Sequence, residues 1–286
     1  MDSKFKEWLS HIINQQILSI KPISGGDISH TYKVETSANA HFLKVNMATN
    51  AAHMFQSEAY ALNLISSTNT IKTPKVLACD TFNGTSFLLL EYIENKSASP
   101  KDFENLGLQL AALHKHTAAN FGLEQDNAIG SLHQSNTRHQ SWIHFYTCER
   151  LLPQLKLAKQ HHLLSESECP SQETIQASLQ LLFSEIKPVL LHGDLWSGNY
   201  IIATDGSPYL IDPAAYYGHN EVDIAMSKLF GGFAPTFYDT YFQVHKLDAN
   251  TQSRIDIYQL YYLLVHLNLF GTSYYHSVIK ILKKYF

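Results

Sequence analysis

The stretch LLHGDLWSGNY (190–200) contains an aspartate and an asparagine whose spacing could serve chemistry. Asp194 follows a short apolar run, Asn199 lies five positions later, and Asp212 ends the run PYLID. In phosphoryl transfer to a hydroxyl, one aspartate accepts the hydroxyl proton, while an asparagine five residues on and a later aspartate hold Mg²⁺. Oxygen atoms of this kind are the ligands that Mg²⁺ prefers. The three residues therefore indicate a base and a metal site, whereas Gly-Asp alone would indicate only a turn.

The first part of the chain contains groups that could bind the phosphates of a nucleotide. Gly25 and Gly26 stand between two strand-like runs, and backbone N–H groups in such a turn can approach phosphates closely. Lys44 follows in the run HFLKV, and Glu58 lies fourteen residues further in a stretch with helical spacing. A strand lysine oriented by a carboxylate can neutralise phosphates. Each residue alone has an ordinary explanation, as a turn, a surface lysine or a solvated glutamate, but their order favours a nucleotide site.

These residues need elements that bring them together, and the hydrophobic pattern predicts which ones. The chain opens with an expected amphipathic helix, whose apolar stripe is Phe5, Trp8, Leu9, Ile12, Ile13 and Ile17. A hairpin is expected over 21–36, further strands at 41–45, 76–79 and 86–93, and a helix over 55–65.

The rest of the chain has a mainly helical pattern. Helices are expected at 103–116, over most of 141–187 with a polar break at 165–172, and at 226–233, 237–245 and 254–270. Short apolar runs with loops between them occur at 188–194, 199–202 and 208–212. The polar segment ENKSASP (94–100) is the expected linker. The sequence therefore predicts an α+β protein with a β-rich nucleotide-binding lobe (1–93) and a mainly helical catalytic lobe (94–286).

The composition of the 286 residues excludes several classes of protein. Hydrophobic residues make up 45% and charged residues 16%, which is typical of a globular chain. A formal charge of -4 provides no basic surface for nucleic acid. The longest apolar run, 260–270, is too short to span a bilayer, and the first residues lack the apolar segment of a signal peptide. The expected partner is thus neither nucleic acid nor membrane.

The cysteines and histidines give no sign of a disulfide framework or of a metal cluster. Cys79, Cys148 and Cys169 are odd in number and far apart, which favours a reducing compartment, the cytoplasm. The 16 histidines are scattered and lack the spacing of zinc ligands.

Longer motifs give a more specific indication. The chain resembles the fructosamine kinase (ketosamine-3-kinase) family, within the kinase-like and aminoglycoside phosphotransferase superfamily. The motifs run in order along nearly the whole chain: ISGGDISHTY, FGLEQDNAIGSLHQ with ERLLPQLKLA after it, LLHGDLWSGN, YYGHNEVDIAMSKLFGGF and QLYYLLVHLNLFG. The resemblance implies a two-lobed protein-kinase-like fold with a small antiparallel sheet. It also implies ATP and Mg²⁺ as cofactors, and phosphorylation of O3 in ketosamines such as fructosamine or ribulosamine adducts, which leads to deglycation.

The resemblance also implies roles for individual residues. Asp194 matches the catalytic base, Asn199 and Asp212 match the metal ligands, and Lys44 with Glu58 matches the phosphate-binding ion pair. The ATP-binding residues that it implies are Gly25, Gly26, Lys44, Glu58, Glu91, Tyr92 and Ile93. The last three lie in the segment that joins the lobes, where backbone groups of Glu91 and Ile93 would bind adenine.

Three further residues are expected to support the substrate or the catalytic loop. Trp196 could form an apolar wall against the sugar or its amine, or it could simply hold the loop in the core. His192 is expected to orient the loop through hydrogen bonds rather than to act as a base. Asp223 resembles an aspartate that braces the catalytic loop, although a carboxylate at a helix N-terminus would explain it too.

Two points are left open by the sequence. Asp27 stands where many relatives carry a cysteine, so redox-controlled pairing of chains through that position is not expected, and its charge is mildly repulsive towards ATP.

The spacing of the residues alone predicts only ATP-dependent transfer of a phosphoryl group to a hydroxyl. The expected substrate is a small or protein-bound glycated amine, used by a monomer. The alternatives are a kinase for another hydroxylated amine or free sugar, and a nucleotide-binding regulator without turnover.

Overall fold

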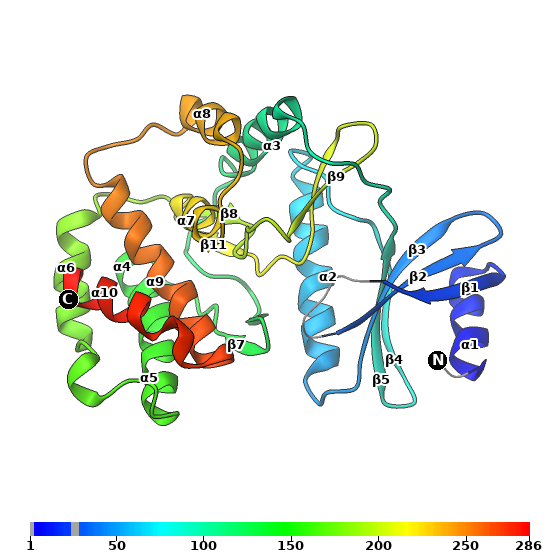
Figure 1. Cartoon of the computed structure of the whole chain (residues 1–286), viewed down its shortest axis with the longest axis horizontal. Coiled ribbons are helices and arrows are strands. Elements are labelled where there is room, and N and C mark those ends of the chain that lie inside the picture. The colour runs from blue at the N-terminus through cyan, green and yellow to red at the C-terminus, as the bar shows by residue number, and fades with distance from the viewer. Residues whose placement is uncertain (1–2, 24–28) are drawn as a thin grey trace.

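The computed structural model describes residues 3–23 and 29–286, and the structural statements below concern those residues. Its N-terminal part is a five-stranded antiparallel sheet with a helix on either side (Figure 1). The strands lie in the order β1-β2-β3-β5-β4. The elements are α1 (Ser3–Ile13), β1 (Ile17–Pro22), β2 (His30–Thr36), β3 (Ala40–Asn46), α2 (Ala51–Ser67), β4 (Val76–Phe82) and β5 (Thr85–Glu91).

Alternation along β3 explains why both faces of the sheet are covered. Leu43 joins Phe5 of α1 in one buried cluster. Phe42 packs with Phe55 of α2 in another. Because successive side chains of a strand point to opposite faces, Lys44 shares the face of Phe42 and is directed towards α2.

The predicted N-terminal helix is shorter than its apolar stripe indicated. Helix α1 ends at Ile13, and Ile17 begins β1. Asn14 has a φ of 51°, a left-handed conformation that ends helices and that asparagine adopts more readily than most residues. The prediction that Ile17 continues the helix was therefore wrong. The predicted strands and the predicted helix over 55–65 all have counterparts in the sheet and in α2.

The remaining residues form helices and three short antiparallel strand pairs. The helices are α3 (Pro100–Leu113), α4 (Trp142–Phe145), η1 (Tyr146–Leu151), α5 (Leu152–Gln160), η2 (Glu166–Glu168), α6 (Gln172–Leu182), α7 (Glu221–Leu229), α8 (Pro235–Val244), α9 (Thr251–Phe270), η3 (Thr272–Tyr274) and α10 (Tyr275–Tyr285). The pairs are β6 (Asn127–Ile129) with β7 (Leu132–Gln134), β8 (Val189–Leu191) with β11 (Tyr216–Gly218), and β9 (Tyr200–Ile202) with β10 (Pro208–Leu210).

Several helix boundaries differ from the sequence prediction, and two of these differences have clear local reasons. The helix expected over 226–233 ends at Leu229, because Gly231 and Gly232 have φ values of 89° and 75°. The helix expected from 103 begins at Pro100. Ser99 caps it by accepting a hydrogen bond from the backbone N–H of Asp102, whose carboxylate in turn accepts from the Ser99 N–H.

Helix α2 shares a hydrophobic core with the helical part, while the two faces of the sheet have clusters of their own. Residues 92–99 lead from β5 to α3. Ala61 and Ile65 of α2 lie in the same buried cluster as Leu106 and Leu110 of α3. One face of α2 therefore packs on the sheet and another packs on the helical lobe. The domain boundary at 93/94 stays a prediction.

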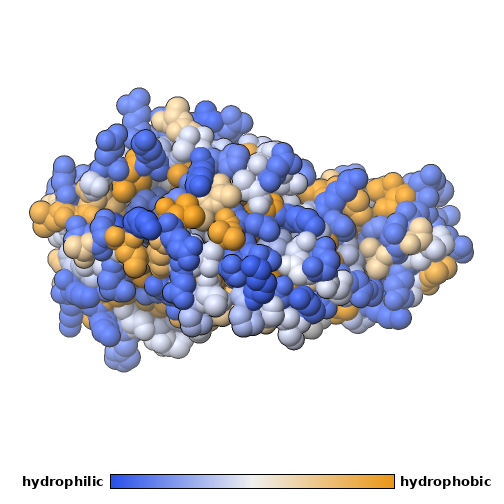
Figure 2. All heavy atoms as spheres, turned by 90° about the horizontal axis from the view of Figure 1, so that it is seen from above, coloured by the Kyte–Doolittle hydropathy of each residue, from blue (hydrophilic) through white to orange (hydrophobic). Residues whose placement is uncertain are grey.

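Figure 2 shows mostly hydrophilic residues over one face, with hydrophobic groups scattered among them. Among the described residues, no helix combines the length and the apolar character needed to cross a membrane. All three cysteines are half-buried free thiols.

Candidate active site

Lys44 lies at the centre of a buried group of charges. Its Nζ is 2.8 Å from Oε1 of Glu58 and 2.6 Å from Oδ1 of Asp212. The direction imposed by β3 brings the lysine to α2, which carries the glutamate. Burial alone would lower the pKa of Lys44, but the carboxylates of Asp212 and Glu58 raise it overall. The ammonium group therefore stays charged, as binding of phosphates requires.

Asp212 is held in an unusual backbone conformation just after β10. Its φ is 54°, in the left-handed region that few residues other than glycine adopt without strain. The N–H of the preceding residue, Ile211, donates to the carbonyl oxygen of Asn199 over 3.1 Å. The loop of Asp212 is thus tied to the loop of Asn199, and the Asp212 side chain is 37% exposed. One face of its carboxylate meets Lys44, and part of it stays open to a ligand.

Asp194 occupies the loop after β8, beside Asn199. The Asn199 Nδ2 donates to the Asp194 carbonyl oxygen over 2.8 Å and to its Oδ2 over 3.1 Å. Removal from water raises the pKa of Asp194 to about 7, and the nearby carboxylate of Asp212 adds to the effect. Because the amide nitrogen of Asn199 is directed to Asp194, its amide oxygen points away from that residue. The pair combines a carboxylate able to take a proton with an oxygen able to bind a cation.

Asp223, at the start of α7, contacts the backbone of the catalytic loop directly. Its carboxylate accepts hydrogen bonds from the N–H groups of His192 and Gly193, both over 2.8 Å. The ring of His114 lies 3.1 Å from the same carboxylate. Burial would raise the pKa of Asp223, but the hydrogen bonds from His114 and the loop backbone lower it overall. This buried carboxylate thus fixes the backbone of the two residues that precede Asp194.

His192 connects the loop of Asp194 to that of Asp212. Its Nε2 lies 2.8 Å from the carbonyl oxygen of Ile211, which can only accept, so this nitrogen carries the proton. Its Nδ1 then accepts from the N–H of Asp194 over 3.2 Å. Burial lowers the pKa of His192, which favours this neutral form. The ring is placed to orient backbone rather than to exchange protons with a substrate.

Trp196 packs over its own loop. A Cβ placed on Gly198 would lie only 2.4 Å from a ring carbon of Trp196, so the indole covers the bare backbone at that glycine. The ring is half-buried and touches the main core. Trp196 therefore packs on its own loop and on the core, and part of the ring remains exposed.

The segment after β5 is where adenine-facing residues were expected. Glu91 ends the strand, and its Oε2 accepts from the N–H of Lys75 over 3.2 Å. The Nζ of Lys33 lies 4.4 Å from the centre of the Tyr92 ring. Ile93 is half-buried in the connection that follows. Gly25, Gly26 and Asp27 lie outside the described residues.

Several contacts that shape the site had no sequence signal. The hydroxyl of Tyr262 donates to the carbonyl oxygen of Gly193 over 2.6 Å, across 69 positions of the chain. His114 reaches Asp223 across 109 positions. A Cβ on Gly193 would lie 2.1 Å from the carbonyl oxygen of Ala214, so the two loops touch through bare backbone. Tyr262 lies in the motif QLYYLLVHLNLFG, but neither its spacing nor its type indicates a partner.

The oxygen atoms of Asn199 and Asp212 suit a hard divalent cation. No group of three or more His, Cys, Asp or Glu side chains among the described residues is arranged to hold a metal. Such a sparse set fits Mg²⁺, which usually takes one or two protein ligands and completes its shell with phosphates and water. It does not fit a structural zinc site, which needs four protein ligands.

Comparison with known proteins gives consistent matches over the whole chain. The family described as fructosamine kinase matches residues 1–286. A probable ketoamine kinase of Lactiplantibacillus plantarum is 39% identical over 282 residues, which cover 98% of this chain and 99% of that protein. The chloroplastic protein-ribulosamine 3-kinase of Arabidopsis thaliana is 39% identical over 290 residues, covering 99% of this chain and 88% of the relative.

Solved structures show the same fold. A putative fructosamine-3-kinase from Thermobifida fusca superposes with a TM-score of 0.89 at 29% identity, covering 99% of this chain and 98% of that one. The apo form of a thermostable mutant of aminoglycoside phosphotransferase APH(4)-Ia superposes with a TM-score of 0.64 at 14% identity, with 98% of each chain covered. The second likeness concerns the fold alone. Together they confirm the expected α+β, kinase-like architecture.

Proposed function

The chain belongs to the fructosamine kinase family, and on that premise we propose that it transfers the γ-phosphoryl group of ATP to O3 of ketosamines. Fructosamine and ribulosamine adducts of amines are the proposed acceptors, and phosphorylation at O3 leads to deglycation. The observation that carries the proposal is the joining of Lys44, Glu58 and Asp212 in one ion-pair group. These three residues come from three separate segments of the chain. Their arrangement, a lysine held by a glutamate beside an aspartate, is the one that kinases use to bind the phosphates of a nucleotide.

The nucleotide would lie between the sheet and the catalytic loop. Lys44 supplies a positive charge for the phosphates, and Glu58 keeps its ammonium in place. Backbone groups of Glu91 and Ile93, with Tyr92 between them, would bind adenine, and Gly25 and Gly26 are the glycines expected to contact the phosphates. A thermostable mutant of an aminoglycoside phosphotransferase with the same fold is described in a ternary complex with ADP and hygromycin B, which supports nucleotide binding by this fold.

Asn199 and Asp212 would hold Mg²⁺. When bound, this ion would offset the charge of the phosphates during transfer. Asp212 already contacts Lys44, so with the ion bound its carboxylate would have two cationic partners. Asn199 also keeps the Asp194 carboxylate in one orientation through its amide N–H.

Asp194 would orient the acceptor hydroxyl and take its proton. Asp223 accepts from the N–H groups of the two residues before Asp194, and the His192 ring accepts from the N–H of Asp194, so neither side chain has a free position from which to act as the base. The exposed part of the Trp196 ring, two residues away, is available to the sugar or its amine. The acceptor would be a small or protein-bound glycated amine. We further propose that the enzyme acts as a cytoplasmic monomer.

A substrate panel tests the proposal. ATP consumption is measured with ribuloselysine, fructoselysine, free ketoses and choline, and NMR then locates the phosphate on any product. We expect turnover with the ketosamines and a phosphate on O3. Turnover confined to choline or to free sugars would refute the ketosamine assignment and favour a kinase for another small acceptor. The absence of acceptor-dependent turnover throughout would favour a nucleotide-binding regulator.

A further inference from the structure

The hairpin of β6 and β7 lies against the loop that carries Asp212. It belongs to the motif FGLEQDNAIGSLHQ, to which the mechanism above assigns no role. Asn127 and Gln134 are opposite each other in the strand register, and both are buried, with exposures of 4% and 2%. Two buried amides on one face of a three-residue strand pair must find polar partners.

The partners of these amides are carbonyl groups that follow Asp212. Asn127 Nδ2 donates to the carbonyl oxygen of Ala215 over 2.9 Å. Gln134 Nε2 donates to Asn127 Oδ1 over 2.7 Å and lies 3.4 Å from the carbonyl oxygen of Ala214. The two carbonyls belong to the second and third residues after Asp212. The hairpin thus holds the chain immediately beyond the candidate metal ligand.

The catalytic loop lies against the same segment. Gly193 approaches the Ala214 carbonyl so closely that a Cβ there would be 2.1 Å from the oxygen. That carbonyl is therefore confined between the backbone next to Asp194 and the amide of Gln134. The confinement fixes the Asp212 segment relative to the catalytic loop.

Helix α9 fixes the hairpin and the catalytic loop at once. Tyr261 donates its hydroxyl proton to Gln134 Oε1 over 2.5 Å. The next residue, Tyr262, donates to the carbonyl oxygen of Gly193. With Oε1 occupied by Tyr261, the amide N–H₂ of Gln134 is directed to Asn127 and to the Asp212 segment.

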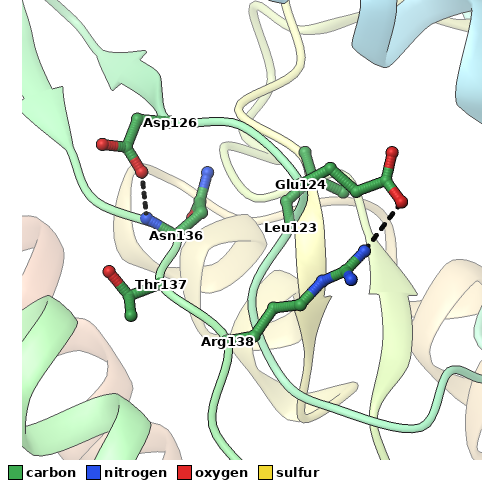
Figure 3. Close-up of a pocket in the computed structure, with 6 residues that line it drawn as sticks. All are labelled: Leu123, Glu124, Asp126, Asn136, Thr137 and Arg138. Atoms are coloured by element: carbon green, nitrogen blue, oxygen red, sulfur yellow. Dashed lines mark hydrogen bonds and ion pairs between the residues drawn. The ribbon is translucent and has the colours of Figure 1, made fainter.

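The outer side of the hairpin base is also anchored. Figure 3 shows Asp126 pointing to the backbone of Asn136, whose N–H it accepts over 2.7 Å. The fully buried Arg150 donates to Asn136 Oδ1 over 2.7 Å and stacks on the Tyr216 ring, 4.0 Å away. The surface hollow in that figure, about 510 Å³ in volume, is lined by none of the candidate site residues. The anchoring makes the hairpin a rigid support.

We propose that Asn127 and Gln134 are positioning residues, which hold Asp212 in its left-handed conformation so that its carboxylate can bind the metal ion beside Asp194. This inference rests on the proposed function, because it takes Asp212 as a metal ligand. A φ of 54° costs more free energy in aspartate than in glycine, so contacts around Asp212 have to stabilise it. Partners that orient a metal ligand typically contribute about 10- to 100-fold to metal affinity.

The test measures Mn²⁺ binding without turnover. Mn²⁺ is titrated into the full-length protein saturated with AMP-PNP, and free Mn²⁺ is followed by electron paramagnetic resonance. Gln134→Met, which removes both amide functions at similar length, should weaken Mn²⁺ binding about 10-fold. Tyr261→Phe deletes only the hydroxyl that orients Gln134 and should give a smaller loss in the same direction. It serves as the test if Gln134→Met does not fold.

His133→Ala is the matched control. His133 is the neighbour of Gln134 on β7, but it faces outwards to Asp126 and is exposed. We expect wild-type Mn²⁺ affinity in this variant. In turnover assays, Gln134→Met should lower kcat and raise the Mg²⁺ requirement while the KM for the acceptor stays unchanged.

Two outcomes overturn the inference, and they differ in what else they affect. Wild-type Mn²⁺ affinity in folded Gln134→Met and Tyr261→Phe proteins would show that the hairpin does not position Asp212, with the proposed function untouched. If the wild-type protein with AMP-PNP binds no Mn²⁺, the metal site of the proposed function fails, and the inference fails with it.

Discussion

At the scale of residues, the site separates a charged side from a proton-accepting side. Lys44 is surrounded by carboxylates and stays protonated, whereas removal from water raises the pKa of Asp194 to about 7. These opposite environments lie close together. Asp212 forms an ion pair with Lys44, and the N–H of Ile211, next to Asp212, donates to the carbonyl oxygen of Asn199. Such a division suits phosphate binding beside proton transfer.

Replacing the proposed base should stop chemistry and spare binding. We expect Asp194→Ala to lower kcat about 10²- to 10⁴-fold, the usual contribution of a positioned general base. Calorimetric titration should still show ADP binding, because Lys44 and Glu58 do not depend on Asp194 for their contact. Near-normal turnover would remove Asp194 from the role of base.

The site residues could be predicted from the sequence only where their types, at short spacing along the chain, indicate a role. Asp194, Asn199 and Asp212 lie within nineteen positions, and they do converge. Lys44 and Glu58 were expected to form an ion pair, and Nζ of Lys44 lies 2.8 Å from Oε1 of Glu58. Contacts made by His114, Tyr262 and the β6–β7 amides span far greater separations, so no local pattern records them.

At the scale of elements, the longer helices and strands were predictable and the short ones were not. The sheet strands and α9 contain enough residues for a period to be recognised. The pairs β6–β7, β8–β11 and β9–β10 have three residues per strand, too few for alternation to stand out. Their positions are set by tertiary contacts, such as the close approach of the loops at Gly193 and Ala214.

That close approach gives a prediction for the catalytic loop. Gly193→Ala combines a φ of +85° with a Cβ 2.1 Å from a carbonyl oxygen, so both strain and a clash arise. We expect a loss of several kcal/mol in the free energy of unfolding, above the ~1–3 kcal/mol typical of a strained φ alone. Thermal denaturation and turnover are measured together.

Gly84→Ala is a matched control for that substitution. Gly84 has a φ of +79°, but a Cβ there would meet nothing within 4 Å. It should therefore show the strain without the clash and keep full activity. Equal destabilisation of the two variants would mean that the close contact between Gly193 and Ala214 adds nothing to the loss in the free energy of unfolding.

At the scale of the whole molecule, the hydrophobic cluster that α2 shares with the helical lobe predicts cooperative unfolding. Ile65 of α2 is fully buried in the cluster that also contains the α3 leucines. Ile65→Ala should cost about 2–5 kcal/mol, as for other large-to-small core substitutions. Because the cluster joins both lobes, the loss should appear equally in the fluorescence of Trp8 in the sheet lobe and Trp142 in the helical lobe. Single-tryptophan variants monitored in urea would test this, and two separate transitions would contradict it.

Buried histidines predict a loss of stability in acid. Burial, with the nearby charge of Arg254, lowers the pKa of His219 from 6.5 to about 3. Below pH 6.5 the unfolded chain therefore binds a proton that the folded chain does not, and stability falls as the pH falls towards 3. At about 1.4 kcal/mol per pKa unit, His219 should account for about 2 kcal/mol between pH 7 and pH 5.

The comparison is made with His219→Gln, which keeps a polar side chain near the Tyr258 hydroxyl, 2.7 Å from His219 Nδ1. Urea unfolding at pH 7 and pH 5 should show a smaller loss in the variant than in the wild type. An identical loss in both proteins would show that protonation of His219 makes no contribution.

Helix α2 has a consequence for the release of product. It carries Glu58 and, seven residues or about 10 Å further along its axis, Ile65, which is embedded among residues of the helical lobe. Because α2 also packs on β5, it joins the two lobes, and a movement that parts them to free ADP has to disrupt one of its two interfaces. Such a movement would also separate Lys44 from Asp212 of the helical lobe, so that departure of the nucleotide and loss of this ion pair would be one and the same movement.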